Sequence, residues 1–141
     1  MARARTCYDH LAGALGVGVT DALLARGLLQ QSTGFSVTDE GLAWFGKLGI
    51  DLAPRRGSRR GPHPAATAQG AARSCLDWTE RRVHLAGRAG AALCTHALEE
   101  GWCERIGSRR ALRVTRKGQD AFEDLLGLRV DEIGVRVEAA A

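Results

Sequence analysis

Apolar residues near the start of the chain recur at three- and four-residue intervals, which is the spacing of one helix face. The pattern predicts a helix over residues 7–26 and is carried by Leu11, Leu15, Val19, Ala22 and Leu23. Gly27 follows and is a natural C-terminal stop. Glycines inside this span lower helix stability, so they indicate either a break that makes a helix-turn-helix or the close approach of a second helix.

A β-hairpin and a further helix are predicted after Gly27. The stretch "LLQQSTGFSVT" places two short apolar runs around a polar turn, which is typical of a hairpin. Thr38 ends it and predicts the N-cap of the helix "DEGLAWFGKLG". The same order returns in "WCERIGSRRALRVT", where Thr115 precedes "RKGQDAFEDLLG". The inward faces of the two helices would carry Trp44, Phe45, Leu48, Phe122, Leu125 and Leu126.

The two halves of the chain are related in sequence. The letters "HLAG" occur at residues 10–13 and again at 84–87, and the same offset of 74 places Gly16 on Gly90. Further along, "FSVTDEGLAWF" matches "LRVTRKGQDAF" at an offset of 77. These matches predict two copies of one unit of about 45 residues. Because units this small are marginal alone, the copies should pack on each other.

The predicted fold class is α+β, with two pseudo-repeated winged-helix-like units, each a helix, a β-hairpin and a helix. Gly13 and Gly16 recur in both copies and favour two long helices that cross closely about a pseudo-two-fold axis. Residues 1–52 form the first repeat, and residues 75–141 form the second repeat with a C-terminal tail. Residues 53–74 hold all three prolines and predict a flexible, basic Pro/Gly/Ala linker.

Charge and composition narrow the function classes. The 141 residues carry a formal net charge of +4, and the arginines of residues 53–74 supply the whole excess. A globally basic DNA-binding face is therefore not predicted, and the linker is either a solvated spacer or an anion-binding arm. The sequence shows neither an export leader nor an 18-residue apolar run, so we expect a cytoplasmic protein without membrane contact and with free thiols.

A repeated Cys-x-Asp motif carries the candidate chemistry. Cys7, Asp9 and His10 lie within one turn of the predicted helix, and Cys75 with Asp77 repeats the first two. Residues three apart share a helix face, so Cys7 and His10 would point the same way. If the repeats pack about a pseudo-two-fold axis, both motifs reach one cleft between the two repeats, which we call the interlobe cleft.

Three interpretations of this interlobe cleft remain open. A soft-metal site would use thiolate and imidazole ligands from Cys7, His10 and Cys75, and no other cofactor is expected. A pocket for a small molecule or metabolite would use aromatic walls and polar groups, from Tyr8, Asp9, His10, Asp77, Trp78 and His84. In a purely structural interpretation, the cysteines fill core gaps, an aspartate caps a helix and the histidines pack against the other repeat.

The same motif also allows an enzyme interpretation. Asp9 and Asp77 would divide acid and base roles, and Cys7 or Cys75 would be the nucleophile. The chain would then be a stand-alone biosynthetic enzyme that acts on a small-molecule metabolite.

Nucleic acid is a competing class of partner. The second hairpin has no acidic residue between positions 105 and 117, so it could contact phosphates. Its basic residues are Arg105, Arg109, Arg110, Arg113, Arg116 and Lys117. The first hairpin is uncharged or acidic, and residues 19–26 contain neither Asn nor Gln to read bases. DNA contact is therefore expected only through the second hairpin, which would be the wing of the second winged-helix-like unit and is called the second wing below.

Three stretches resemble the C-terminal domain of actinobacterial transcriptional regulators of the ArsR family. They are "RTCYDHLAGALGVGVTDALLARGLL", "GFSVTDEGLAWFGKLGIDL" and "CLDWTERRVHLAGRAGAALCTHALEEGW", and together they cover nearly the whole chain. In that family a winged helix-turn-helix precedes this region and binds DNA, and this sequence does not include it. The resemblance implies a regulator-type protein that binds a small molecule or metal effector, with a homodimer or a partner protein supplying the DNA-binding domain.

Overall fold

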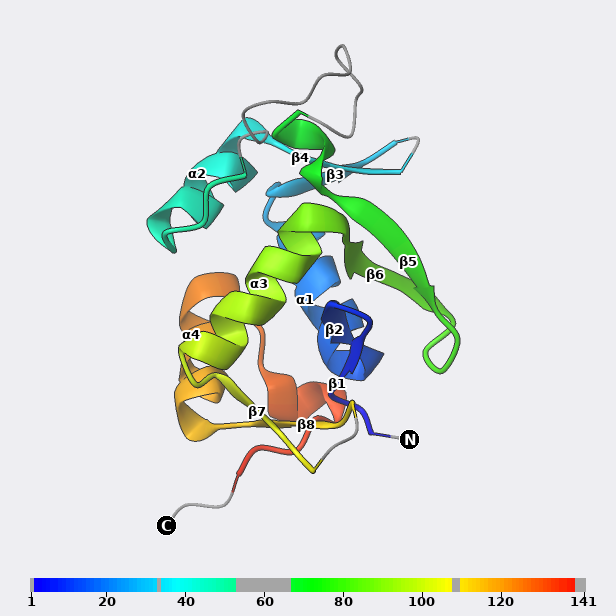
Figure 1. Cartoon of the computed structure of the whole chain (residues 1–141), viewed down its shortest axis with the longest axis vertical. Helices are drawn as coiled ribbons and strands as arrows, with labels where there is room; N and C mark the ends of the chain where they lie inside the picture. Colours follow the sequence, from blue (N-terminus) through cyan, green and yellow to red (C-terminus); the bar gives the residue numbers. More distant parts are fainter. Residues whose placement is uncertain (1, 33, 53–66, 108–109, 139–141) are drawn as a thin grey trace.

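The computed structural model describes residues 2–32, 34–52, 67–107 and 110–138. Within these ranges, four α-helices and four two-stranded antiparallel sheets follow the same order in each half (Figure 1). The first half contains β1 (Arg5–Cys7), β2 (His10–Ala12), α1 (Gly13–Ala25), β3 (Leu29–Gln31), β4 (Phe35–Val37) and α2 (Asp39–Lys47). The second contains the 3₁₀ turn η2 (Gln69–Ala71), β5 (Arg73–Asp77), β6 (Arg82–Ala86), α3 (Gly87–Glu99), β7 (Cys103–Arg105), β8 (Leu112–Val114), α4 (Arg116–Leu126) and the 3₁₀ turn η3 (Val130–Ile133). The α+β class is confirmed.

The first helix begins later than the sequence pattern predicts. Residues 5–12 form the β1–β2 hairpin, so the prediction of helix is wrong over residues 7–12. Gly13 has a φ of +70°, a value that residues with a side chain rarely adopt, and it turns the chain from strand into helix. From Gly13 onward α1 is one continuous helix, so of the two arrangements that its glycines left open, the helix-turn-helix break does not occur.

The glycines shared by the two repeats do not mark a crossing of two helices. A Cβ atom on Gly16 would collide with the carbonyl of Leu11 and lie 3.5 Å from the Cβ of His84. A Cβ on Gly90 would lie 2.7 Å from a strand carbonyl and 3.3 Å from the Cβ of His10. Each glycine therefore lets a helix start pack closely on its own hairpin and on the histidine of the other half. The predicted helix–helix contact at these positions is wrong.

The later local predictions are confirmed. Both expected hairpins form, as β3–β4 and β7–β8. The hydroxyl oxygens of Thr38 and Thr115 each accept a hydrogen bond of 3.0 Å from the backbone N–H three residues on, so both residues cap the following helix. Gly27 ends α1 with a φ of +71°.

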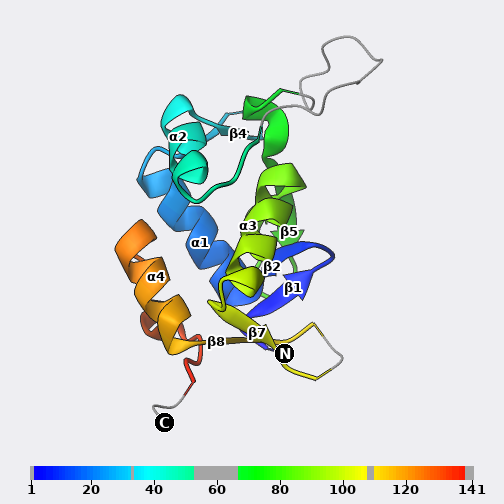
Figure 2. The same cartoon turned by 60° about the vertical axis from the view of Figure 1, so that its left-hand side comes forward.

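One hydrophobic core joins the two halves. α1 and α3 run through the middle of the molecule, with α2 and β3–β4 at one end and β7–β8 at the other (Figures 1 and 2). Phe45, Phe122 and Leu126 are buried as predicted, and Trp44, Leu48 and Leu125 pack partly buried against them. Among the described residues, no helix has the length and apolarity needed to cross a membrane.

The predicted linker, residues 53–74, falls largely outside the described residues. Its described part contains η2, in which Ala71 is buried, and the start of β5 at Arg73. β5 and β6 are five residues long, whereas β1 and β2 have three. The second half therefore has the longer leading hairpin.

Candidate metal centre

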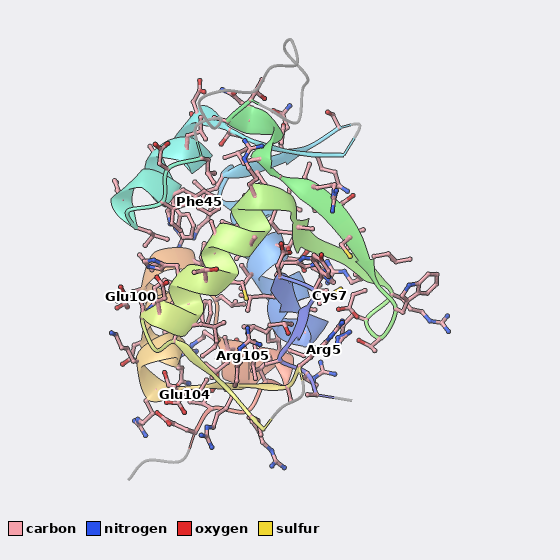
Figure 3. All side chains as sticks on the ribbon, viewed as in Figure 1. Arg5, Cys7, Phe45, Glu100, Glu104 and Arg105 are labelled. Atoms are coloured by element: carbon pink, nitrogen blue, oxygen red, sulfur yellow. The ribbon has the colours of Figure 1, made fainter. Side chains whose placement is uncertain are left out.

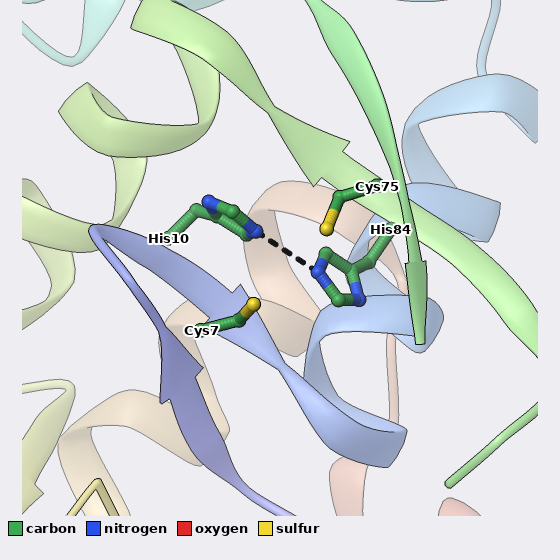
Figure 4. A group of neighbouring side chains, drawn as sticks. All are labelled: Cys7, His10, Cys75 and His84. Atoms are coloured by element: carbon green, nitrogen blue, oxygen red, sulfur yellow. Dashed lines mark hydrogen bonds between the residues drawn. The ribbon is translucent and has the colours of Figure 1, made fainter. Parts of the chain in front are cut away.

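The β1–β2 and β5–β6 hairpins bring two cysteines and two histidines to one point (Figure 4). Cys7 lies opposite His10 in the first hairpin, and Cys75 lies opposite His84 in the second. Residues directly opposite on antiparallel strands share a face of the sheet, so each hairpin presents one thiol beside one imidazole. One ligand atom of each residue lies within 4.8 Å of those of the other three. The imidazoles point toward each other, and the thiols lie on either side of them.

The two histidines form a buried pair between the halves. Only 5% of His10 and 1% of His84 is exposed, and their Nε2 atoms are 2.9 Å apart. At this distance one Nε2 donates a hydrogen bond and the other accepts it. Burial, together with the neighbouring His10, lowers the pKa of His84, which favours its neutral form. Neutral imidazole is the form that binds metals.

Each histidine has a carboxylate beside its Nδ1 atom. Asp9 Oδ1 lies 3.2 Å from Nδ1 of His10 and accepts a hydrogen bond there. Asp77 Oδ2 lies 3.2 Å from Nδ1 of His84, but the contact does not have hydrogen-bond geometry. Nδ1 of His84 is therefore a buried polar atom without a hydrogen-bond partner in the described part of the chain.

Asp77 is a buried carboxylate that joins the second hairpin to the first half. Its Oδ2 accepts a 2.7 Å hydrogen bond from the N–H of Gly13, the first residue of α1. Its Oδ1 accepts from Thr79, from the N–H of Glu80 and, at 3.0 Å, from the guanidinium of Arg5. Burial alone would raise the pKa of Asp77, but these hydrogen bonds and the Arg5 charge hold it well below its usual range. Asp77 therefore stays ionised and caps α1 from the other repeat.

The four cysteines are free thiols of two kinds. Cys7 and Cys75 are half-buried in the cluster, whereas Cys94 and Cys103 are buried in the core. Burial and the neighbouring Cys7 raise the pKa of the Cys75 thiol. Burial raises the pKa of Cys94 as well, and that of Cys103 to about 12. Without a bound cation, the thiols of Cys75, Cys94 and Cys103 are thus protonated at neutral pH.

The structure brings together the predicted metal ligands and adds one. Cys7, His10 and Cys75 meet as expected, although on strands instead of a helix. His84 completes the cluster, whereas the sequence suggested it for an organic ligand only. The signal that could have identified it is the "HLAG" repeat, because a ligand in one copy implies its counterpart in the other.

A cavity of about 490 Å³ opens beside the cluster. Three of the predicted ligand-binding residues line it, namely Asp77, Trp78 and His84. The rest of its lining includes Arg5, Cys7, Leu76 and Arg110. Tyr8 is 86% exposed in the turn of the first hairpin and is not part of this lining. An organic molecule bound here would lie against one cysteine and one histidine of the cluster.

The two carboxylates do not face each other across this site. Asp9 lies behind His10 and Asp77 lies behind His84, so the pair of imidazoles separates them. The side chain of Asp9 is 56% exposed, whereas that of Asp77 is fully buried. The catalytic roles of Asp9, Asp77, Cys7 and Cys75 stay predictions.

The basic second hairpin is less positive than its own residues suggest. Arg113 pairs with Glu104 at 3.0 Å, and Lys117 lies 3.8 Å from Glu100. Glu104 and Arg105 lie along β7, at the end of the molecule away from Phe45 (Figure 3). Arg109 lies outside the described residues. The acidic partners precede position 105, which is why the count over residues 105–117 missed them.

The chain is similar in sequence to a bacterial protein named as a regulator. It is 44% identical over 128 residues to YdfF of Bacillus subtilis (strain 168), an "uncharacterized HTH-type transcriptional regulator". The matched region covers 90% of this chain and 53% of YdfF, so the chain spans about half the length of that relative. No family model matches the chain. No solved structure matches it either.

Proposed function

We propose that the chain is the effector-responsive part of a transcriptional regulator, with the effector bound where the β1–β2 and β5–β6 hairpins meet. The observation that carries the proposal is that each half contributes one thiol and one imidazole to the cluster. The similarity to a protein named as an HTH-type regulator supports this class, as does the resemblance to the ArsR family.

An effector at this position can act on both halves at once. α1 packs against β6, and α3 packs against β2, so each central helix rests on the hairpin of the other half. The hydroxyl of Thr20 in α1 also accepts a 2.7 Å hydrogen bond from the N–H of Leu85 in β6. A ligand that draws the hairpins together therefore favours one arrangement of the helices, which is how an effector shifts a conformational equilibrium.

The effector class that the donor set favours is a soft metal ion. Two thiols and two imidazoles are ligands that such ions prefer, and the buried pair of histidines leaves little room for an organic molecule between the hairpins. An organic effector in the adjoining cavity is the alternative.

The DNA contact belongs to the second wing in this proposal. Arg105, Arg110 and Arg116 have no acidic side chain within ion-pair distance in the described part of the chain. They can therefore contribute positive charge to a phosphate backbone, in contrast to the paired Arg113 and Lys117.

DNA binding of the full chain tests the proposal. Binding to the promoter fragment of its own gene should be measured by fluorescence anisotropy over a salt series, with zinc and with a chelator. We expect zinc to change the affinity, and Arg110→Ala to lower the slope of log affinity against log salt by about 1. Arg129→Ala is the matched control, because this arginine pairs with Glu123 and Glu132 outside the wing. Absence of DNA binding, or binding that no effector changes, would overturn the proposal.

A further inference from the structure

We infer that Cys7, His10, Cys75 and His84 form a closed tetrahedral site for one zinc ion per chain. The inference rests on the proposed function only for the role of the ion as effector. The coordination itself is derived from the side chains of the two hairpins and is tested without DNA.

The donor set and its spacing fit zinc. Structural zinc sites are four-coordinate and use thiolates and imidazoles, with ligand atoms about 2.0–2.3 Å from the ion. Ligand atoms around such a tetrahedron lie roughly 3.3–3.8 Å apart. Here the two Nε2 atoms are 2.9 Å apart and all four ligand atoms lie within 4.8 Å of one another. Changes in these distances of no more than about 1 Å would therefore reach the tetrahedral spacing. Two thiolates would also balance the charge of a divalent ion.

The contacts of the ring nitrogens fit a metal ion between the histidines. The two Nε2 atoms face each other at 2.9 Å, and each Nδ1 atom has a carboxylate oxygen at 3.2 Å. Nδ1 of His84 is buried and has no hydrogen-bond partner in the described part of the chain. A metal ion bound by both Nε2 atoms would leave both Nδ1 atoms to donate to these carboxylates.

The carboxylates behind the histidines are a second sign of a metal site. A metal-bound histidine almost always donates its other N–H to a carboxylate, a carbonyl or water, which fixes the ring. Both histidines of the cluster have a carboxylate oxygen 3.2 Å from Nδ1. Asp77 is itself held by Gly13 and Arg5, so it is a positioning residue for His84.

The test uses the full chain, stripped of metal with a chelator under reducing conditions. Cobalt(II) serves as the coloured probe, and zinc is then added to displace it. We expect one ion per chain, thiolate-to-cobalt charge-transfer bands, the visible bands of tetrahedral cobalt, and loss of both on addition of zinc. Native mass spectrometry should show the same stoichiometry for zinc.

Matched variants locate the ion. Asp77→Asn should lower zinc affinity by about 10- to 100-fold, the range found when an outer carboxylate is lost. Cys7→Ser and Cys75→Ser should each lower it further than that and weaken the charge-transfer bands, because only one thiolate remains. Cys94→Ala is the control, because this buried cysteine lies outside the cluster, and it should bind as the wild type does. Circular dichroism of each variant establishes that it is folded.

Two results would overturn the site: a wild-type chain that takes up neither cobalt nor zinc, or a folded Cys7→Ser variant that binds them equally well. Uptake of copper(I) in place of zinc would show the zinc assignment to be wrong. Metal binding that leaves DNA affinity unchanged would instead retain the site and reject the proposed function. DNA binding without metal uptake would reject the site and leave the regulator proposal standing.

Discussion

Asp9 and Asp77 occupy the same position in two copies of one motif, yet their surroundings are opposite. Asp9 is more than half exposed and contacts His10, whereas Asp77 is fully buried and accepts hydrogen bonds from four residues. The difference follows from the six extra residues of the second hairpin, which curl Thr79 and Glu80 back onto the carboxylate. Aspartate at this position therefore holds the fold together in the second copy and lies at the surface in the first.

Replacing these two aspartates should have unequal effects on stability. Asp77→Asn should lower the free energy of unfolding of the metal-free chain by about 3 kcal/mol, because it removes one partner of a buried ion pair. Asp9→Asn should change it by no more than about 0.5 kcal/mol, as is usual at an exposed site. Urea denaturation followed by circular dichroism measures both. Equal losses in the two variants would contradict the assigned roles.

The two kinds of cysteine should differ in reactivity. Cys7 and Cys75 are half-buried, whereas Cys94 and Cys103 are enclosed in the core. Because a disulfide reagent must reach the sulfur atom, it should modify two thiols of the native metal-free chain quickly and the other two only after unfolding. Zinc should slow the fast pair. Fast modification of all four thiols would show that the core cysteines are accessible.

At the scale of elements, the second hairpin and the second helix of each repeat could be predicted from local sequence alone. Thr38 and Thr115 were identifiable as N-caps, and the hairpins before them as turns between apolar runs, because these features depend on neighbours in sequence. The start of each central helix was not predictable in this way. Leu11 fits the helical spacing but lies in a strand, and only a positive φ at Gly13 separates the two elements.

Substitution of Gly87 tests whether the positive φ and the close packing at the start of a central helix require glycine. Gly87 has a φ of +76°, and a Cβ there would lie 2.5 Å from the carbonyl oxygen of Ala71. Gly101 has a φ of +73° with nothing within 4 Å, so it isolates the cost of the backbone conformation. Gly101→Ala should cost about 1 kcal/mol, and Gly87→Ala at least about 1 kcal/mol more because of the clash. Thermal or urea unfolding of both variants measures the difference.

At the scale of the whole molecule, the halves are interlocked. The N–H of Leu112 donates to the carbonyl of Ala4, and that of Thr6 donates to the carbonyl of Arg110, so the start of the chain also contacts the β7–β8 hairpin. Cys7, His10 and Cys75 were predicted from sequence as candidate metal ligands, because they belong to one short repeated motif. His84 was not, although it is the counterpart of His10 in the repeat, because the motif alone does not show that the two histidines meet across 74 residues.

Zinc should stabilise this interlocked arrangement as a unit. An ion that binds the folded chain and not the unfolded one adds about 2.7 kcal/mol at a free concentration one hundred times Kd. The melting temperature of the wild type should therefore rise with zinc in a concentration-dependent manner, while that of Cys75→Ser should not. Differential scanning calorimetry with and without a chelator measures this. A wild-type melting temperature that is independent of zinc would contradict it.

The reciprocal contact between His10 and His84 has a consequence for the origin of the chain. Two identical copies of a single repeat, associated as a symmetric dimer, would place the same pair of histidines and pair of thiols on their shared axis. Joining the copies in one polypeptide keeps this arrangement without a second subunit and makes its assembly independent of protein concentration. It also allows the sequence of each copy to change independently. Two identical subunits could not have acquired the contrast between the exposed Asp9 and the buried Asp77.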